Sequence, residues 1–295
     1  MSNFALVNMC VMRKAIFFVL SLLFFATIVV PTGCTDKKPQ AADTSTVDSI
    51  VADTSEVDSS EEIIASTPMP KAADELFDDF VFNFAANRKL QSKRIAFPLK
   101  VYRNGKLYKE IPERQWRMEH FFMRQQYYTL IFDNERQMNL VKDTAVAHVI
   151  IEKIFFDKKV VQQFLFDRID GRWMMSSMNY KPIFKNKNAD FLHFYERFAR
   201  DSVFQIESMA DEVEFSAPDP NDDFSSINGI MMPQQWPDFK PGLIPKGNIY
   251  NIIYGQKYTE TGKKIFVIRG IANGLEIEMT FKRFGKHWKL VKFNS

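Results

Sequence analysis

The sequence FDRIDGRW at positions 166–173 returns, with changes, as FKRFGKHW at positions 281–288. Phe, Arg, a bulky apolar residue and Trp keep the same spacing in both stretches. Each stretch is typical of a β-hairpin, with its turn at Asp-Gly in the first and at Gly-Lys in the second. The two hairpins lie 115 positions apart, which indicates one domain that occurs twice.

A helical pattern at the start of each half agrees with this duplication. We call residues 71–182 the first repeat and residues 183–295 the second repeat. Phenylalanines spaced three and four residues apart give a helix in each repeat one apolar face. They match at a constant offset of 114 positions, as Phe77, Phe80 and Phe84 in the first repeat and Phe191, Phe194 and Phe198 in the second.

Strands are expected to follow the helices in each repeat. Leu275, Ile277, Met279 and Phe281 alternate with polar residues, as in an antiparallel sheet with one buried and one wet face. This order predicts an α+β fold of two tandem cone-like domains, each with N-terminal helices packed on a curved antiparallel sheet. The predicted strands are Tyr127–Phe132, Ala145–Phe155, Val160–Arg168, Arg172–Met178, Ile249–Tyr254, Lys264–Ile271, Leu275–Arg283 and Trp288–Phe293.

The matching strand of the first repeat departs from this alternation on both sides. Gln162 takes a place on the core-facing side, where a polar side chain needs hydrogen-bond partners. It therefore either lines a pocket or bonds to the backbone. On the other side, Val161 and Leu165 are apolar where the second repeat is polar or charged. We expect the other repeat or a partner to cover these two residues.

A helix is expected after Pro112, because proline is favoured at the first helical position. It would carry Trp116 and His120. His120 is the one histidine that merits a test as an acid–base group, against the alternative of a half-exposed helix histidine with no catalytic role. Trp116, His120 and Gln162 are thus the candidate pocket residues, although Trp116 is interpreted more simply as a core anchor.

The first 33 residues have the pattern of a lipoprotein signal peptide. Arg13 and Lys14 precede an uncharged apolar run over residues 15–30, and Gly33 directly precedes Cys34. Cys34 resembles the cysteine of bacterial lipoproteins that is diacylated on its sulfur and becomes the new N-terminus. Two or more acyl chains would anchor the protein stably to a membrane of the cell envelope.

Two alternatives concern this leader. Translation could begin at Met12 instead of Met1. The apolar run could also stay as an uncleaved anchor. Its 16 residues, at about 1.5 Å each, would span roughly 24 Å, which is less than the ~30 Å hydrocarbon core of a bilayer. The length therefore favours a cleaved leader.

Residues 34–70 are rich in Ser, Thr, Asp, Ala and Pro. Such a segment cannot bury enough apolar area to offset its chain entropy, so we expect a disordered acidic tether. The net charge is −6 over residues 34–67, +6 over residues 68–182 and +1 over residues 183–295. The surplus on the first repeat could favour an anionic partner, but an ordinarily solvated basic domain explains it as well.

The sequence lacks the motifs of common catalytic and cofactor sites. It has no Gly-rich phosphate loop and no Gly-x-Ser-x-Gly motif. After cleavage only Cys34 would remain, which excludes a free thiol nucleophile and cysteine metal sites. We therefore expect no metal and no cofactor, and for a tethered envelope protein no nucleic acid. The histidines are scattered without a metal-binding pair, at His120, His148, His193 and His287.

In element order, each repeat resembles the nuclear-transport-factor-two-like, cystatin-like superfamily, in which a bent sheet wraps a long helix into a cone. The Phe-rich helix, the Pro-x-x-x-Trp or Pro-x-x-Trp start and the terminal hairpin carry this resemblance over residues 71–295. With the lipidation signal and the tether, the chain resembles an uncharacterised lipoprotein family of anaerobic gut bacteria, a domain of unknown function. These motifs are structural, so the resemblance implies a fold and no activity.

Three functions are compatible with the sequence. The first is a non-catalytic, lipid-anchored module that binds an envelope protein or a small ligand. The second is a cone-pocket enzyme (a hydrolase, isomerase or dehydratase) that uses His120 beside a carboxylate. The third is a structural subunit of an assembly. The first is favoured, because a tether is predicted and no catalytic constellation is.

Overall fold

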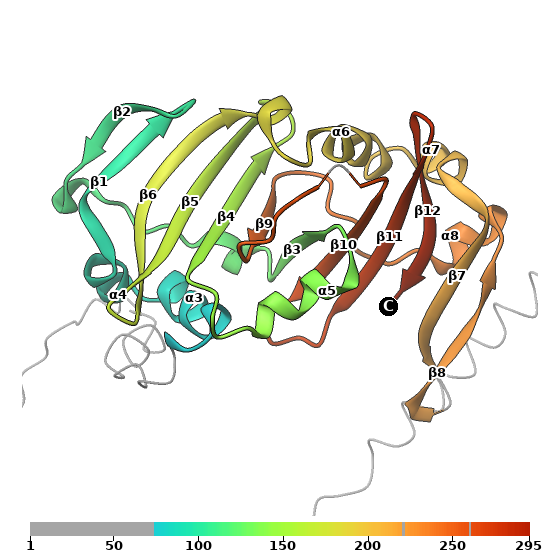
Figure 1. The fold of residues 1–295 in the computed structure, drawn as a ribbon. Coiled ribbons are helices and arrows are strands. Elements are labelled where there is room, and N and C mark those ends of the chain that lie inside the picture. Colours follow the sequence, from blue (N-terminus) through green and yellow to red (C-terminus); the bar gives the residue numbers. More distant parts are fainter. Residues whose placement is uncertain (1–73, 220–221, 260) are drawn as a thin grey trace, which may run out of the picture. The chain divides into compact units, whose positions relative to one another are not determined.

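A computed structural model describes residues 74–219, 222–259 and 261–295, all within one compact unit. The predicted leader, Cys34 and the tether lie outside these residues. Helices and a large curved, mostly antiparallel sheet form the unit, so the predicted α+β fold is confirmed (Figure 1). In the described part of the chain, none of the helices combines the length and the apolar character that a membrane span requires.

The first repeat begins with helices and continues into strands. Its helices are α3 (Phe77–Ala86), α4 (Arg88–Lys93) and α5 (Glu135–Met138), with 3₁₀ turns η2 (Glu113–Gln115), η3 (Phe121–Arg124) and η4 (Asn139–Lys142). Its strands are β1 (Ile95–Arg103), β2 (Lys106–Ile111), β3 (Tyr127–Phe132), β4 (His148–Phe155), β5 (Val160–Ile169) and β6 (Arg172–Pro182).

The second repeat has a similar order of elements, although its described residues include no counterpart of α5 and η4 between the third and fourth strands. Its helices are α6 (Ala189–Phe198), α7 (Ser202–Glu207) and α8 (Trp236–Phe239), with 3₁₀ turns η5 (Ile183–Lys185) and η6 (Pro233–Gln235). Its strands are β7 (Met209–Asp219), β8 (Asp222–Met231), β9 (Ile249–Ile253), β10 (Lys263–Gly270), β11 (Glu276–Phe284) and β12 (His287–Asn294).

The described strands of both repeats join one 12-stranded sheet, in the order β2-β1-β6-β5-β4-β9-β3-β10-β11-β12-β7-β8. β3 of the first repeat pairs with β10 of the second, and β9 of the second repeat pairs with β4 of the first. The repeats thus exchange their third strands across the middle of the sheet, where β3 and β9 run parallel. The boundary between residues 182 and 183 stays a prediction, since each half of the sheet holds a strand from the other repeat.

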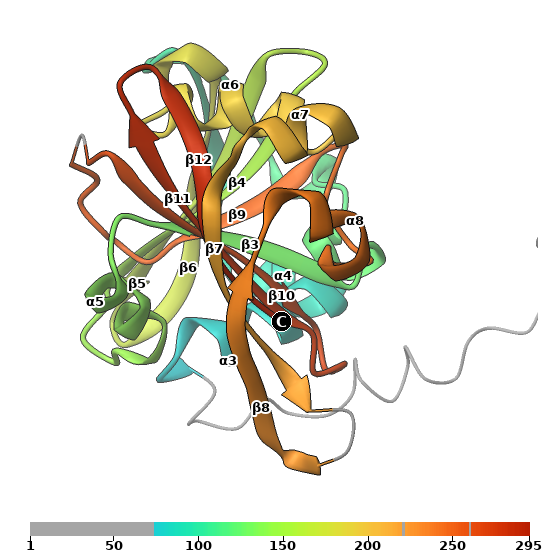
Figure 2. The same ribbon diagram turned by 90° about the vertical axis from the view of Figure 1, so that its right-hand side faces the viewer.

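The helices of the two repeats cover opposite faces of this sheet (Figures 1 and 2). Neighbouring residues of a central strand therefore belong to different cores. In β10, Ile265 and Val267 pack in the core of the first repeat, while Phe266 and Ile268 pack in the core of the second. Burial on both faces explains why the central strands are nearly continuous apolar runs and do not alternate.

Aromatic side chains fill the space between α3 and the sheet. Phe77 and Phe84 of the helix meet Phe166 of β5, with ring centroids 5.2 and 5.4 Å apart and steep interplanar angles. Phe77 also meets Trp173 of β6 edge-on at 5.1 Å. Such edge-to-face pairs each add about 0.5–1.5 kcal/mol beyond the burial of their surface.

The second repeat reproduces these contacts. Phe198 of α6 meets Phe281 of β11 at 5.2 Å, and Phe191 meets both Phe281 and Trp288 at 5.5 Å. Trp173 and Trp288 therefore have like surroundings, each against the first phenylalanine of its repeat's helix. The Phe-rich helix and the terminal hairpin are equivalent parts of the two repeats.

A buried glutamine anchors a tryptophan in each repeat. The Gln91 side chain donates to the Phe84 carbonyl at 2.9 Å and accepts the indole N–H of Trp116 at 3.0 Å. Gln205 repeats both bonds, at 2.8 Å to the carbonyl of Phe198 and at 3.0 Å from the indole of Trp236. Both tryptophans are therefore held as anchors of the fold.

The helix expected after Pro112 does not form. The 3₁₀ turn η2 ends at Gln115, Trp116 has an extended backbone, and His120 stands just before η3. The backbone N–H and C=O of Glu119 bond the side chain of Gln91, at 3.2 and 2.7 Å, in place of helical partners. A long-range side-chain contact thus replaces the local hydrogen bonds that the proline predicted.

Candidate functional site

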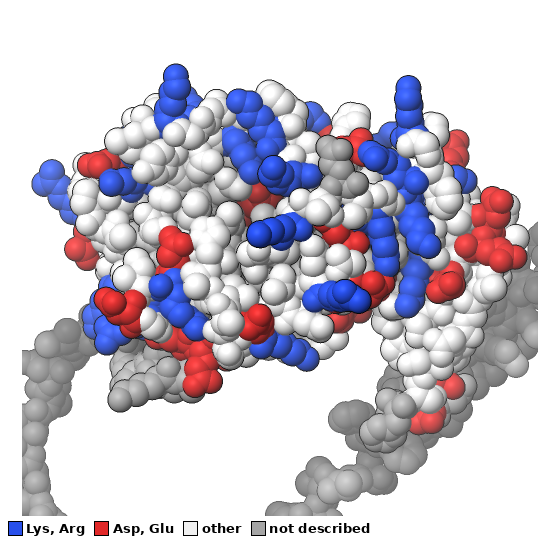
Figure 3. Space-filling view, in the orientation of Figure 1, with Lys and Arg blue, Asp and Glu red and all other residues white. Residues whose placement is uncertain are grey.

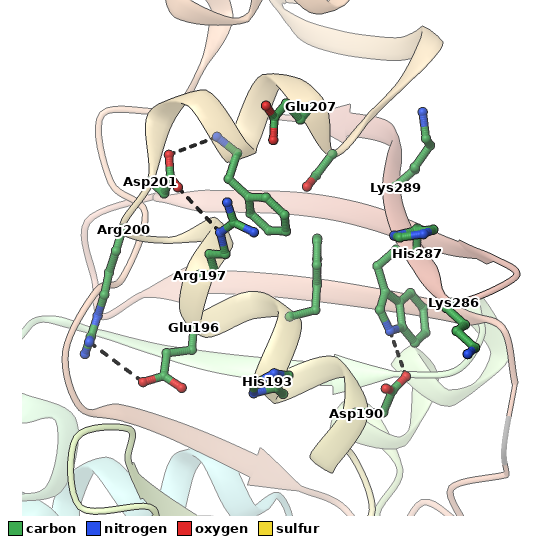
Figure 4. A pocket seen from close by; sticks show the side chains of 14 residues that line it. Asp190, His193, Glu196, Arg197, Arg200, Asp201, Glu207, Lys286, His287 and Lys289 are labelled. Atoms are coloured by element: carbon green, nitrogen blue, oxygen red, sulfur yellow. Dashed lines mark hydrogen bonds and ion pairs between the residues drawn. The ribbon is translucent and has the colours of Figure 1, made fainter.

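The largest of the described hollows is an open groove on the second repeat, with a volume of about 770 Å³ (Figure 4). It lies between α6, α7 and the β11–β12 hairpin. Four basic, four acidic and two histidine side chains line it, together with three aromatic rings and one serine. We call this hollow the groove.

The floor of the groove is apolar and belongs to the core of the second repeat. Phe194 of α6 is 9% exposed and Trp288 of β12 is 5% exposed, and their rings lie 6.5 Å apart. The Trp288 indole donates to Asp190 at 2.9 Å, and Arg283 donates to the same carboxylate oxygen at 3.3 Å. The hairpin is therefore held against the first turn of α6.

Ion pairs fix one wall of the groove. Arg197 stacks over the ring of Phe204 at 3.9 Å and lies 3.5 Å from the Asp201 carboxylate. Arg200 donates to Asp157 at 2.7 Å. Backbone N–H donation from Phe204, which lies at the start of α7, and the nearby Arg197 guanidinium hold the pKa of Asp201 below its ordinary value. These charged side chains therefore already have partners within the protein.

Other charged groups of the groove are free to meet a ligand. No side-chain hydrogen bond or ion pair to a described residue is made by His193, Lys286, His287 or Glu207. His193 and His287 are exposed, on α6 and β12 respectively (Figure 4). A general base requires a partner that orients it, and neither histidine has one. The arrangement suits binding better than proton transfer.

The predicted pocket residues lie in the first repeat, away from the groove. Trp116 is partly buried and packs on Phe97 at 6.5 Å. His120 is half-buried, and its imidazole makes no hydrogen bond or ion pair with a described residue. The carboxylate that the enzyme hypothesis requires is therefore not within hydrogen-bond reach of His120 among these residues.

Glu119, which sequence reasoning passed over, is the carboxylate at this end of the first repeat. It accepts the Tyr250 hydroxyl at 3.3 Å and lies 3.6 Å from the Lys153 ammonium. Burial is the main cause that raises the pKa of Tyr250, and the negative charge of Glu119 raises it further. Gln162 is the cross-strand neighbour of Lys153, so Glu119 connects the surroundings of Trp116 and Gln162.

Gln162 itself is only half-buried, and the buried polar residue of β5 is its neighbour Gln163. Phe164 and Phe166, toward one end of β5, pack in the core of the first repeat with helix α3. Val161, toward the other end, points to the opposite face of the sheet and packs in the core of the second repeat. The buried face therefore switches along the strand. Gln163 donates to Glu152 at 2.9 Å, inside a buried polar network.

This network lies under the start of α6, where the repeats meet. Glu152 is 1% exposed and accepts two bonds of 3.0 Å from Asn186. Beside it, the Lys264 ammonium donates to Asp133 at 2.5 Å and to Asn188 at 2.8 Å. The buried charges are thus paired and hydrogen-bonded, which fits a structural role at the junction.

The predicted interface residues have different surroundings. Val161 is fully buried in the core of the second repeat. Leu165 is half-buried on β5, between Ile150 of β4 and Ser177 of β6. The second repeat therefore covers Val161, while Leu165 stands at the border of the covered area.

Two further polar clusters could carry chemistry. On the open face of the first repeat, Asp167 contacts His148 at 2.6 Å and Ser176 at 2.5 Å. The carboxylate stands between the other two, so the serine has no adjacent base and is not activated as a nucleophile.

The second cluster lies at the start of α3. Tyr254 and Tyr128 both donate to Asp78, the latter at 3.3 Å. Burial raises the pKa of Asp78, although the two hydroxyl donors oppose it. Asp78 lines neither the groove nor the two smaller described hollows. Within the described residues, no group of three or more His, Cys, Asp or Glu side chains could hold a metal ion.

A bent sheet that wraps a helix in each half defines an NTF2-like α+β protein. A solved NTF2-like protein from Bacteroides fragilis NCTC 9343 has a similar structure, with a TM-score of 0.70 and 40% sequence identity. The match covers 77% of this chain and 98% of that chain.

A family model described as a domain of unknown function (DUF4348) matches residues 56–295. The chain belongs to this family. No curated protein matches it. The expected membership in an NTF2-like family of unknown function is confirmed.

Proposed function

We propose that the protein is a cell-envelope lipoprotein whose folded part binds a partner protein without catalysis. The filled interior of both cones is the observation that supports this most strongly. Phe121 and Phe164 lie 4.9 Å apart in the first core, and Tyr195 and Phe266 lie 4.4 Å apart in the second. Because aromatic rings occupy these interiors, a small ligand has less room there than a protein segment has in the groove.

The groove suits an extended segment of a partner. Its apolar floor of Phe194 and Trp288 can accept an apolar side chain, and His193, Lys286 and His287 can meet an acidic one. Well-packed aromatic residues beside charged groups are typical of the sites that dominate binding energy at protein interfaces. We infer a partner segment that carries an acidic residue next to an apolar one.

The enzyme alternative has less support. It requires His120 beside a carboxylate in a hollow, and the half-buried His120 has no such neighbour among the described residues. The groove histidines likewise have no orienting carboxylate. A binding role requires neither arrangement.

Lipidation of Cys34 would place this module at the membrane surface. Residues 35–70 would act as a flexible tether of roughly 33 Å, for a coil that grows as about 5.5 Å times the square root of its length. The folded unit would then reach partners on neighbouring envelope proteins. Growth with labelled palmitate tests this part, since label should enter the wild-type chain and be absent from Cys34→Ser.

Affinity capture from envelope extracts tests the binding role. The wild-type chain should retain a specific protein that Lys286→Glu/His287→Glu loses, because both changes reverse or remove the positive side of the groove. Lys185→Glu/Lys187→Glu is the matched control, with a comparable charge change at exposed residues outside the groove. Equal capture by the groove variant and the control would contradict a partner site in the groove.

A further inference from the structure

The sheet has two open edges, β2 at one end and β8 at the other. Each pairs with one neighbour only, β1 and β7 respectively. Among the described residues, no other strand satisfies the outward-facing N–H and C=O groups of these edges. An unpaired edge is a template for another strand, so folded proteins usually cover or blunt it.

Large apolar side chains remain exposed on both edges. Leu107 and Tyr108 of β2 are 56% and 54% exposed. Ile227 and Ile230 of β8 are 43% and 59% exposed. These residues add apolar surface to the free backbone groups, and such surface at a sheet edge is characteristic of a pairing site.

The hairpins at the two edges carry opposite net charge. Residues 95–111, which form the β1–β2 hairpin, hold four basic side chains and one acidic, a net charge of +3. Residues 209–231, which form the β7–β8 hairpin, hold six acidic side chains and no basic one, a net charge of −6. Figure 3 shows acidic side chains over β7 and β8 at one end of the molecule, and Lys and Arg at the outer border of β1 and β2 at the other.

The charges oppose pairing of like edges. Two β2 edges would bring Lys106 and Lys109 of both molecules together, and two β8 edges would bring two hairpins of charge −6 together. Like charges directly across neighbouring strands are destabilising, whereas opposite charges across an interface favour encounter and fix its register.

We propose that the protein associates head to tail with further copies of itself, through pairing of the β2 edge of one molecule with the β8 edge of the next. β2 has 6 residues and β8 has 10, so the shorter edge fits along the longer one. When two molecules pair through two different surfaces, one β2 edge and one β8 edge remain unpaired at the ends. Each added molecule therefore leaves one edge of each kind free. The result is an open row in which the sheets continue from molecule to molecule.

The test uses the full chain in a mild detergent, with molar mass measured by light scattering at rising protein concentration. The basic-edge variant is Lys106→Glu/Lys109→Glu, and the acidic-edge variant is Glu212→Lys/Glu214→Lys. All four positions are exposed and have no ion pair to a described residue, so both variants should fold. Lys185→Glu/Lys187→Glu is the control away from the edges.

We expect the mass of the wild-type chain and of the control to grow with concentration and to fall with added salt. Each edge variant should need a roughly tenfold or higher concentration to associate. An equimolar mixture of the two edge variants should regain association as pairs, because the unchanged β2 edge of the acidic-edge variant meets the unchanged β8 edge of the basic-edge variant, and their hairpins keep opposite net charges of +3 and −6.

A wild-type chain of constant mass over the whole concentration range overturns the proposal. Association that persists unchanged in both edge variants also overturns it, since the contact would then lie elsewhere or in the detergent micelle. Failure of the mixed variants to associate contradicts the pairing of these two edges.

Discussion

The two repeats share a scaffold but differ at the end where Trp116 and Trp236 are anchored. Both repeats use the same buried glutamine and the same aromatic contacts. At the sites that differ, the first repeat has Glu119, Lys153 and Gln162, where the second has Phe239, Ile268 and Ile277. The duplication therefore preserved the anchoring residues, while positions that are polar and half-buried in the first repeat became apolar in the second, where Ile268 and Ile277 belong to the core.

The repeats also differ at the groove, which lies on the second repeat. His193, Arg197 and His287 line it in the second repeat, and the matching positions of the first repeat are Asp79, Asn83 and Arg172.

Expressing the repeats as separate chains, 71–182 and 183–295, should have the largest effect. The first core would lose Tyr250, Ile252 and Tyr254, which come from or directly follow the exchanged strand β9. We expect neither fragment alone to show cooperative unfolding by circular dichroism, and the two together to form a complex on gel filtration. A cooperatively folded single repeat would show that the exchange is dispensable.

Phe84→Ala and Phe198→Ala should each destabilise the full chain by about 3–5 kcal/mol, because each removes a fully buried ring from its core. Urea unfolding followed by tryptophan fluorescence measures the loss. Since the exchanged strands couple the two cores, we expect one transition in both variants. Two separate transitions would mean that the repeats unfold independently.

Gln91→Leu and Gln205→Leu should cost about 1–3 kcal/mol each, because they leave a tryptophan N–H and a backbone carbonyl without a partner. The exposed Gln234→Leu is the matched control and should change stability little. The loss should be the larger at Gln91, which also bonds the backbone of Glu119, so a larger loss at Gln205 would break the equivalence of the two anchors.

The smallest effect concerns pH. Burial raises the pKa of Asp78 above its ordinary value, so the folded chain holds this proton at a pH where the unfolded chain has lost it. Stability should therefore fall as pH rises from the ordinary carboxyl pKa to the raised one, and stay level above it. Asp78→Asn should remove this slope from a series of urea titrations. If the stability of Asp78→Asn varies with pH as that of the wild type does, groups other than Asp78 cause the slope.

The sequence was sufficient for the two Phe-rich helices and most strands, because these follow from local spacing. Phe77, Phe80 and Phe84 lie where a helical face requires them, and β3 has the predicted bounds. β7 and β8 were not predicted, since acidic and proline residues dominate their pattern. The expected helix after Pro112 was wrong, because a distant glutamine side chain takes the hydrogen bonds of Glu119.

The exchange of β3 and β9 could not be read from the sequence. Both are short apolar strands at matching places in their repeats, and a local pattern does not specify which β-strand each will pair with. The continuous apolar run of β10, at residues 265–268, did hold the signal that both faces of a central strand are buried. The groove was also hidden, because His193 and His287 are 94 positions apart and come to one hollow through tertiary contacts such as that of Asp190 with Trp288.

The exchanged strands also impose an order on biogenesis. The first core cannot close until β9 has been synthesised, and β9 ends at Ile253, late in the chain. Until then the first repeat has the aromatic residues of its core but an unfinished sheet. If the chain is exported as an extended thread, as the proposed lipoprotein would be, this delay would keep the polypeptide from folding before it crosses the membrane.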